Sequence, residues 1–179
     1  DELKLFWNQK AKVIAVSLKD RGAVLPGGHL ADGAYWYKDK KFITSSYYMD
    51  ELPEWVNDFN NRNLVDTYFV KGWQPLLATS LYTASLPDKN PYESLYEGEK
   101  YPVLPKDLAD LAKQNDPEEV LKRSPWGNSL ILEFGLAAVT KEELGQDDIT
   151  DFSALSFSST DYMGHAYAPR SLEVQDMYL

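Results

Sequence analysis

The chain contains no cysteine and only two histidines, His29 and His165, among its 179 residues. The absence of cysteine excludes disulfide bonds and thiolate metal sites, and it is compatible with any cellular compartment. No apolar run approaches the roughly 20 residues that a membrane-spanning helix requires, so we expect no membrane span. Any imidazole ligand of a metal must be one of the two histidines.

Basic residues are few relative to acidic ones: 18 Lys and Arg stand against 28 Asp and Glu, which gives a formal net charge of −10. This balance argues against non-specific binding to nucleic acid or to anionic membranes, so we expect neither as a partner. The length is sufficient for a domain with a substantial core.

An aspartate and a histidine near the C-terminal end are spaced as a candidate metal half-site. The apolar segment 152–157 predicts a buried strand, and Asp161 and His165 follow it, four positions apart. A carboxylate oxygen and an imidazole nitrogen both suit zinc, and a coiled backbone would place them on one side. Gly164 would leave room for close backbone approach, and Pro169 would end the turn. An ordinary polar loop is the usual meaning of this spacing alone.

Two cations near the N-terminal end form a candidate anion clamp. The apolar, β-branched run 13–18 predicts a buried strand. Lys19 and Arg21 follow it, and the glycines and proline of 22–28 predict a flexible loop behind them. Arg offers a planar fork of donors to phosphate oxygens and Lys a compact charge. The alternative is a solvated charged turn. His29 could approach such a site, but a structural or solvent-facing role is the interpretation we prefer.

The rest of the chain predicts a mixture of helices and strands. Tyrosines, tryptophans and prolines are interleaved over 66–125, where we expect loops with short helices whose aromatic side chains pack a cap, although they could instead line a substrate surface. Asp147, Asp148 and Asp151 predict an exposed turn, which we prefer to the alternative of a calcium site. The predicted hairpin strands are 34–37 and 42–47. The predicted helices are a short one within 1–11, and 53–61, 105–114, 117–123, 128–140 (capped by Asn128 or Ser129), 141–145 and 171–179 (capped by Ser171).

Four motifs together resemble one enzyme family. SLKDRGA (17–23), GAYWY (33–37), SPWGNS (124–129) and SFSSTDYMGHAYAPRSLEVQDMYL (156–179) are similar to the alkaline phosphatase superfamily. The resemblance covers the whole chain and is closest to the phosphate-irrepressible monoesterase branch of the type I phosphodiesterase/nucleotide pyrophosphatase family. It implies an α/β fold that is part of an alkaline-phosphatase-like α/β/α sandwich. The core would comprise 1–32 and 126–179, with 33–125 as an inserted, loop-rich, aromatic, cap-like subdomain.

The resemblance also implies roles for the two residue pairs. Asp161 and His165 would be two of the three protein ligands of one catalytic zinc, in an enzyme that uses two zinc ions. Lys19 and Arg21 would contact the non-bridging phosphoryl oxygens of a phosphate ester. Such a cation pair matches a monoester dianion better than a diester monoanion. The expected activity is therefore metal-dependent hydrolysis of phosphate monoesters, with periplasmic or secreted localisation.

The family's nucleophile and several of its metal ligands are not identifiable in this chain. Thr160 precedes Asp161, but in the family that position belongs to the metal-ligand motif. The resemblance thus implies an internal fragment of a longer enzyme that is inactive by itself. Two alternatives stay open: a nucleotide pyrophosphatase or phosphodiesterase of the same superfamily, and a binding module without catalytic activity. The oligomeric state is not indicated by the sequence.

The isolated 179-residue chain should bind zinc only weakly, because two protein ligands are too few for a stable tetrahedral site. Isothermal titration calorimetry of the chain with Zn²⁺ tests this. Tight, stoichiometric binding would contradict it and would mean that further ligands lie within the chain.

Overall fold

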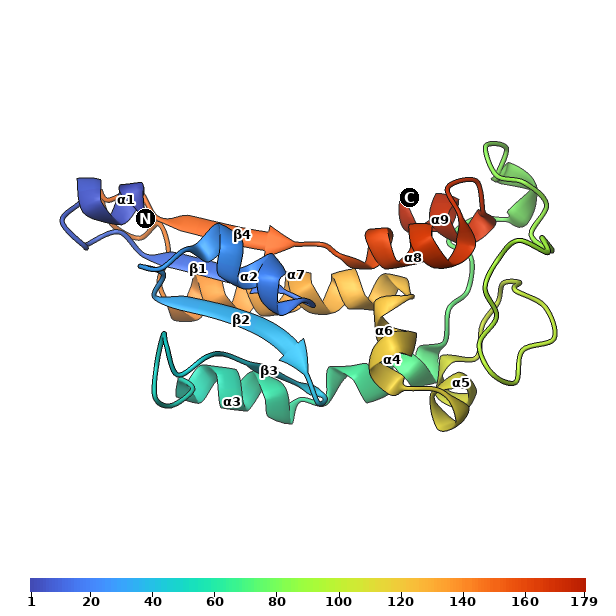
Figure 1. The fold of residues 1–179 in the computed structure, drawn as a ribbon, viewed down its shortest axis with the longest axis horizontal. Coiled ribbons are helices and arrows are strands. Elements are labelled where there is room, and N and C mark those ends of the chain that lie inside the picture. Colours follow the sequence, from blue (N-terminus) through green and yellow to red (C-terminus); the bar gives the residue numbers. More distant parts are fainter. The chain divides into compact units, whose positions relative to one another are not determined.

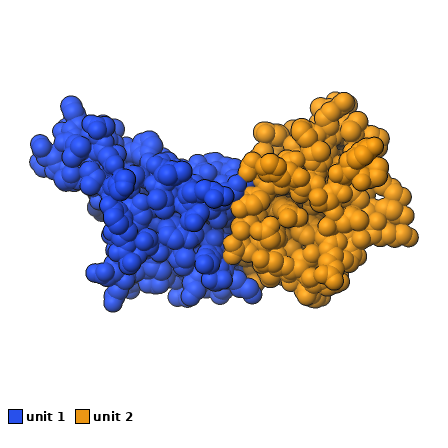
Figure 2. All heavy atoms as spheres, in the orientation of Figure 1, with its two compact units in different colours: residues 1–63, 129–158 blue, residues 64–128, 159–179 orange.

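The computed structural model describes residues 1–179 as two compact units (Figure 2). The first unit comprises residues 1–63 and 129–158, and the second comprises 64–128 and 159–179. The predicted division into core segments and an insertion at 33–125 stays a prediction. No helix in the chain combines the length and the apolar character needed to cross a membrane.

A four-stranded mixed sheet forms the centre of the first unit (Figure 1). Its strands are β1 (Val13–Ser17), β2 (Gly33–Lys38), β3 (Lys41–Ile43) and β4 (Phe152–Ser156), in the order β3-β2-β1-β4. β2 and β4 run parallel to β1, and β3 pairs antiparallel with β2. The predicted strands 13–18 and 34–37 are confirmed, and a hairpin forms, but its second strand is Lys41–Ile43 rather than 42–47. β4 is an edge strand with partly exposed residues rather than the fully buried strand predicted for 152–157.

One face of the sheet is lined with alanine, which lets a helix approach closely. Ala15 pairs in register with Ala34 of β2 on one side and with Ala154 of β4 on the other. Helix α2 (Asp20–Gly27) packs against this face through small residues, and a Cβ built on Gly27 would lie only 3.2 Å from the Cβ of Ala15. Side chains this small bring the helix backbone near the strands and bury β1 on this side.

The opposite face is covered by aromatic packing. Phe134 of α7 (Pro125–Lys141) stacks on Phe42 of the sheet with ring centroids 3.9 Å apart. Phe59 of α3 (Glu54–Asn61) meets the same Phe134 ring edge-on at 5.0 Å. Helices therefore lie on both faces of the sheet (Figure 1), and the predicted α/β class with α/β/α layering is confirmed.

Three predictions about loops and helices are also wrong. Residues 22–27 form most of α2 rather than a loop, because the small residues that look like loop signals instead allow close helix–sheet packing. The helix ends at Gly27 and is followed by Gly28, which has a φ of 77°. α7 begins at Pro125, where proline suits the first helical turn, and not at an Asn128 or Ser129 cap. Residues 142–145 form turns, so the predicted helix 141–145 does not exist.

The second unit is helical and contains a long irregular segment between residues 72 and 107. The chain's remaining helices are α1 (Glu2–Phe6) in the first unit, and α4 (Leu64–Lys71), η1 (Thr79–Leu81), α5 (Leu108–Gln114), α6 (Pro117–Lys122), α8 (Ser159–Tyr167) and α9 (Leu172–Met177) in the second. The sequence did not indicate α4. The predicted Ser171 cap of α9 is confirmed, since its Oγ accepts the Val174 N–H at 3.1 Å.

A buried carboxylate in α9 anchors the irregular segment. Asp176 accepts the Trp73 indole N–H at 2.7 Å, the Leu76 backbone N–H at 2.7 Å and the Tyr82 hydroxyl. Three donors compensate this carboxylate for the loss of its hydration. The predicted packing role therefore holds for most of the aromatic side chains here. The buried ones are Tyr68, Phe69, Trp73, Tyr82 and Tyr96, whereas Tyr92 and Tyr101 are exposed.

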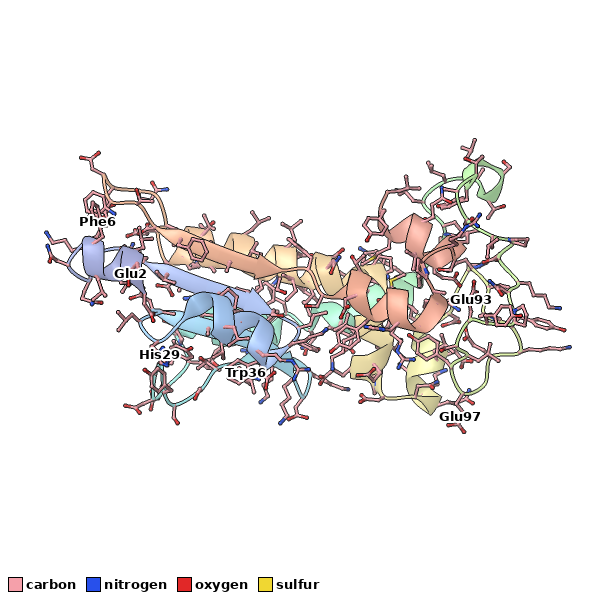
Figure 3. All side chains as sticks on the ribbon, turned by 45° about the horizontal axis from the view of Figure 1, so that its top comes forward. Glu2, Phe6, His29, Trp36, Glu93 and Glu97 are labelled. Atoms are coloured by element: carbon pink, nitrogen blue, oxygen red, sulfur yellow. The ribbon has the colours of Figure 1, made fainter.

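A lysine and several carboxyl groups are also buried in this unit. The fully buried Lys106 ammonium lies 2.8 Å from a Glu99 oxygen and 3.8 Å from a Glu173 oxygen. Burial raises the pKa of Glu173 to about 8 and that of Glu93 (labelled in Figure 3) to about 7; nearby carboxyl groups add to the increase and Lys106 opposes it. The chain nowhere gathers three His, Asp or Glu side chains that could hold one metal ion.

Stability of the second unit should therefore fall as the pH rises from about 4.5 to about 8. Because the pKa of Glu173 rises from 4.5 to about 8 on folding, the folded state keeps this proton where the unfolded chain has lost it, so the free energy of unfolding decreases between these pH values. Glu173→Gln should flatten this decline by an amount on the order of 1.4 kcal/mol for each unit of pKa difference.

Urea unfolding of the wild type and Glu173→Gln at pH 5 and pH 9 measures this effect. The control is Glu97→Gln, whose exposed side chain (Figure 3) should leave the pH dependence unchanged. An identical decline in the wild type and Glu173→Gln would rule out Glu173 as its source.

Candidate active site

The two predicted phosphate-binding cations lie where β1 passes into α2. Lys19 is the N-cap residue of α2 with an extended backbone, and its N–H donates to the Ser17 hydroxyl at 3.0 Å. Arg21 is exposed in the first helical turn. The backbone N–H groups here already have partners in the chain: that of Arg21 donates to the Asp20 carboxylate at 2.6 Å, and that of Gly22 to the Lys19 carbonyl at 3.1 Å. The groups that could bind a phosphate oxyanion are therefore the two cationic side chains.

The predicted metal pair lies on one face of α8. Asp161 and His165 are one helical turn apart, with the imidazole Nε2 3.5 Å from a carboxylate oxygen. The Asp161 side chain is 57% exposed and that of His165 83% exposed, so both groups remain accessible to an ion. The predicted shared orientation is confirmed. Nothing in this chain lies within 4 Å of a Cβ built on Gly164, so the close backbone approach predicted there stays a prediction.

Asn128, which the sequence suggested as a cap of the helix 128–140, instead holds the start of α8. The Asn128 Oδ1 accepts the Ser159 N–H at 3.1 Å, and its amide donates to the Thr160 hydroxyl at 3.3 Å. Asn128 thus satisfies a backbone donor that a helix start leaves open. The SPWGNS motif contains this residue, but no local pattern showed that its side chain reaches a segment 31 positions away.

The strands that lead to the two pairs are neighbours in the sheet. β1 and β4 run parallel, with Ser17 opposite Ser156, so their carboxyl ends lie at one edge of the first unit. Lys19 and Arg21 belong to this unit, whereas Asp161 and His165 belong to the second. The structure brings the side chains of Asp161 and His165 together, and it places Lys19 and Arg21 at the start of one helix. That the two pairs serve one site stays a prediction.

His29 lies away from the cation pair. It follows the C-terminal end of α2 and precedes β2, so it is at the amino-terminal edge of the sheet, opposite the edge where Lys19 lies. Its side chain is 82% exposed (Figure 3), and Nδ1 lies 3.5 Å from an Asp1 oxygen. This placement supports the solvent-facing interpretation.

Replacing Gly22 or Gly164 by alanine should change the free energy of unfolding in opposite directions. A Cβ at Gly22 would overlap the Ser17 hydroxyl and lie 3.3 Å from the Ser156 Oγ, so Gly22→Ala should destabilise by about 1–3 kcal/mol. Gly164→Ala should stabilise by about 0.5–1 kcal/mol, since it fills open space in a helix. Urea unfolding provides both values. If both substitutions changed the free energy of unfolding equally, close packing at Gly22 would not be the cause of the effect there.

Comparison with known proteins identifies the family. The sequence model described as type I phosphodiesterase / nucleotide pyrophosphatase matches residues 2–179. Alkaline phosphatase PhoV of Synechococcus elongatus is 48% identical over 181 residues, and alkaline phosphatase PafA of Elizabethkingia meningoseptica is 45% identical over 182 residues. A Myroides odoratus protein named calcium-transporting ATPase is 46% identical over 183 residues. Each alignment covers 100% of this chain and 32–33% of the relative.

The crystal structure of wild-type PafA matches the fold with a TM-score of 0.94 and 45% identity, covering 100% of this chain and 35% of that one. The chain thus spans about a third of the length of these relatives. It belongs to the type I phosphodiesterase / nucleotide pyrophosphatase family.

Proposed function

We propose that this chain is the central part of a longer zinc-dependent alkaline phosphatase that hydrolyses phosphate monoesters. The observation that carries the proposal is the position of a cation pair and a carboxylate–imidazole pair after two neighbouring parallel strands, β1 and β4. In open α/β sheets, ligands bind beyond the carboxyl ends of the strands. The PhoV and PafA relatives, both named alkaline phosphatases, support the reaction class.

Lys19 and Arg21 would bind the phosphoryl group. In phosphoryl transfer, negative charge is spread over the non-bridging oxygens, so cations placed around them stabilise the transition state. Two cations complement the dianion of a monoester better than the monoanion of a diester. A second matched structure is a PafA variant with four substitutions, among them a lysine and an arginine two positions apart, which is the spacing of Lys19 and Arg21.

Asp161 and His165 fit part of a zinc site. They supply one oxygen and one nitrogen donor, 3.5 Å apart on an exposed helix face, and both donor types are common zinc ligands. A complete site needs more ligands than this pair, and the chain gathers no group of three. We therefore assign the remaining ligands, and the nucleophile, to parts of the longer protein outside this chain. Zinc, when bound, would supply charge that stabilises the attacking and leaving oxygens.

The same family also contains nucleotide pyrophosphatases and phosphodiesterases, as its name states, and a diesterase is the alternative activity. The second alternative is a binding module that has no catalytic activity. The longer protein would be periplasmic or secreted, as the resemblance to alkaline phosphatases implies.

The test uses the full-length protein with p-nitrophenyl phosphate and bis-p-nitrophenyl phosphate as substrates. The monoester should have the higher kcat/KM, and Lys19→Ala and Arg21→Ala should each reduce it on the order of 10-fold to 1,000-fold, the range seen when one transition-state donor is lost. Asp161→Ala and His165→Ala should abolish turnover and lower the zinc content measured by atomic absorption.

Lys10→Ala and Asp58→Ala, which change exposed charges of the same types elsewhere in the first unit, are the matched controls and should retain full activity. Faster turnover of the diester would favour the phosphodiesterase. Unchanged rates in the Lys19 and Arg21 variants would remove both residues from the mechanism. Absence of turnover in a zinc-loaded wild type would favour the binding module.

A further inference from the structure

Ser17 is a buried polar residue at the last position of an apolar strand. β1 reads Val-Ile-Ala-Val-Ser, and Ser17 is completely inaccessible to solvent. A hydroxyl group in such a place costs free energy unless it makes hydrogen bonds, so its contacts indicate what it does. We infer that Ser17 is the positioning residue for the Lys19–Arg21 segment, which rests on the proposed phosphate-binding role of that segment.

The Ser17 hydroxyl joins two chain segments that leave the sheet side by side. Its oxygen accepts the Lys19 backbone N–H at 3.0 Å, which fixes the N-cap residue of α2. The same oxygen lies 3.4 Å from the Ser158 hydroxyl, which lies 3.2 Å from that of Ser156 in β4. A hydroxyl has one proton and two lone pairs, so Ser17 can accept from Lys19 and donate to Ser158 at once.

Gly22 packs against the same hydroxyl from the first turn of α2. A Cβ at this position would overlap the Ser17 oxygen and lie 3.3 Å from the Ser156 oxygen. Residues 19 and 22 therefore contact Ser17 from both sides of Arg21. These two contacts hold the backbone on either side of Arg21.

Such positioning matters because a phosphate clamp depends on geometry. A misplacement of about 1 Å can reduce a rate on the order of 100-fold. Loss of the Ser17 hydroxyl leaves the Lys19 N–H without its buried acceptor and frees the first turn of α2 to shift. The side chains of Lys19 and Arg21 remain present, but the backbone that carries them is no longer held by the Ser17 hydroxyl.

A double-mutant cycle in the full-length protein tests this. With p-nitrophenyl phosphate, Ser17→Ala should lower kcat/KM on the order of 10-fold to 100-fold. In a Lys19→Ala/Arg21→Ala background the same change should have almost no further effect, because Ser17 acts only through these two side chains. Ser124→Ala is the control: this serine is also fully buried, and its hydroxyl donates to the Leu121 carbonyl at 2.9 Å in the second unit, so activity should be unchanged.

Hydrogen exchange measured by mass spectrometry gives a readout that does not need activity. In Ser17→Ala the peptide covering 17–23 should exchange faster, while the peptide covering β2 (33–38) should not change, which also shows that the variant is folded. The inference would be overturned if Ser17→Ala lowered kcat/KM by the same factor in the wild type and in the Lys19→Ala/Arg21→Ala background, while hydrogen exchange of the 17–23 peptide stayed unchanged. An inactive wild type would instead refute the proposed function, and the exchange result would still decide the role of Ser17.

Discussion

Strand β1 is hydrogen-bonded along both sides, to β2 and to β4, and every residue of it is buried. The rest of the first unit depends on this constraint. β1 is covered by α2 on its alanine face, and its neighbour β2 is packed on the other face, where Tyr35 contacts the Phe134 ring, so β1 has little freedom to shift. A rigid strand is suited to carry functional groups at its end, because these groups keep their positions. Lys19 and Arg21 follow directly after it.

The two candidate pairs have different physical characters. The cation pair is tied to the protein by backbone contacts at Ser17 and Gly22, whereas the Asp161–His165 pair projects from an exposed helix face. A clamp for phosphate gains from rigid placement. A metal half-site instead needs open space in which the remaining ligands can complete the coordination. Both features agree with a chain that spans about a third of the length of its relatives.

In the second unit, buried charged groups hold a segment that has little regular secondary structure. Asp176 collects three hydrogen bonds from the irregular segment, and Lys106 is enclosed by carboxyl groups and the Tyr167 ring. Buried charges of this kind give little net stability, but they fix one arrangement, since removing one partner leaves the other uncompensated. This explains how a segment with many prolines and few helices can still bury most of its aromatic side chains.

The sequence by itself determined the local features: the β-branched strand 13–17, the hairpin, the Ser171 cap, the one-turn spacing of Asp161 and His165, and the motifs that identify the family. Each depends on residues a few positions apart. Only the tertiary structure decided that 20–27 is a helix, that Asn128 holds the start of α8, and that Ser17 contacts Ser158. Glycine and proline favour a loop locally, but close packing against the alanine face outweighs that preference, and contacts between residues far apart in the chain leave no local pattern.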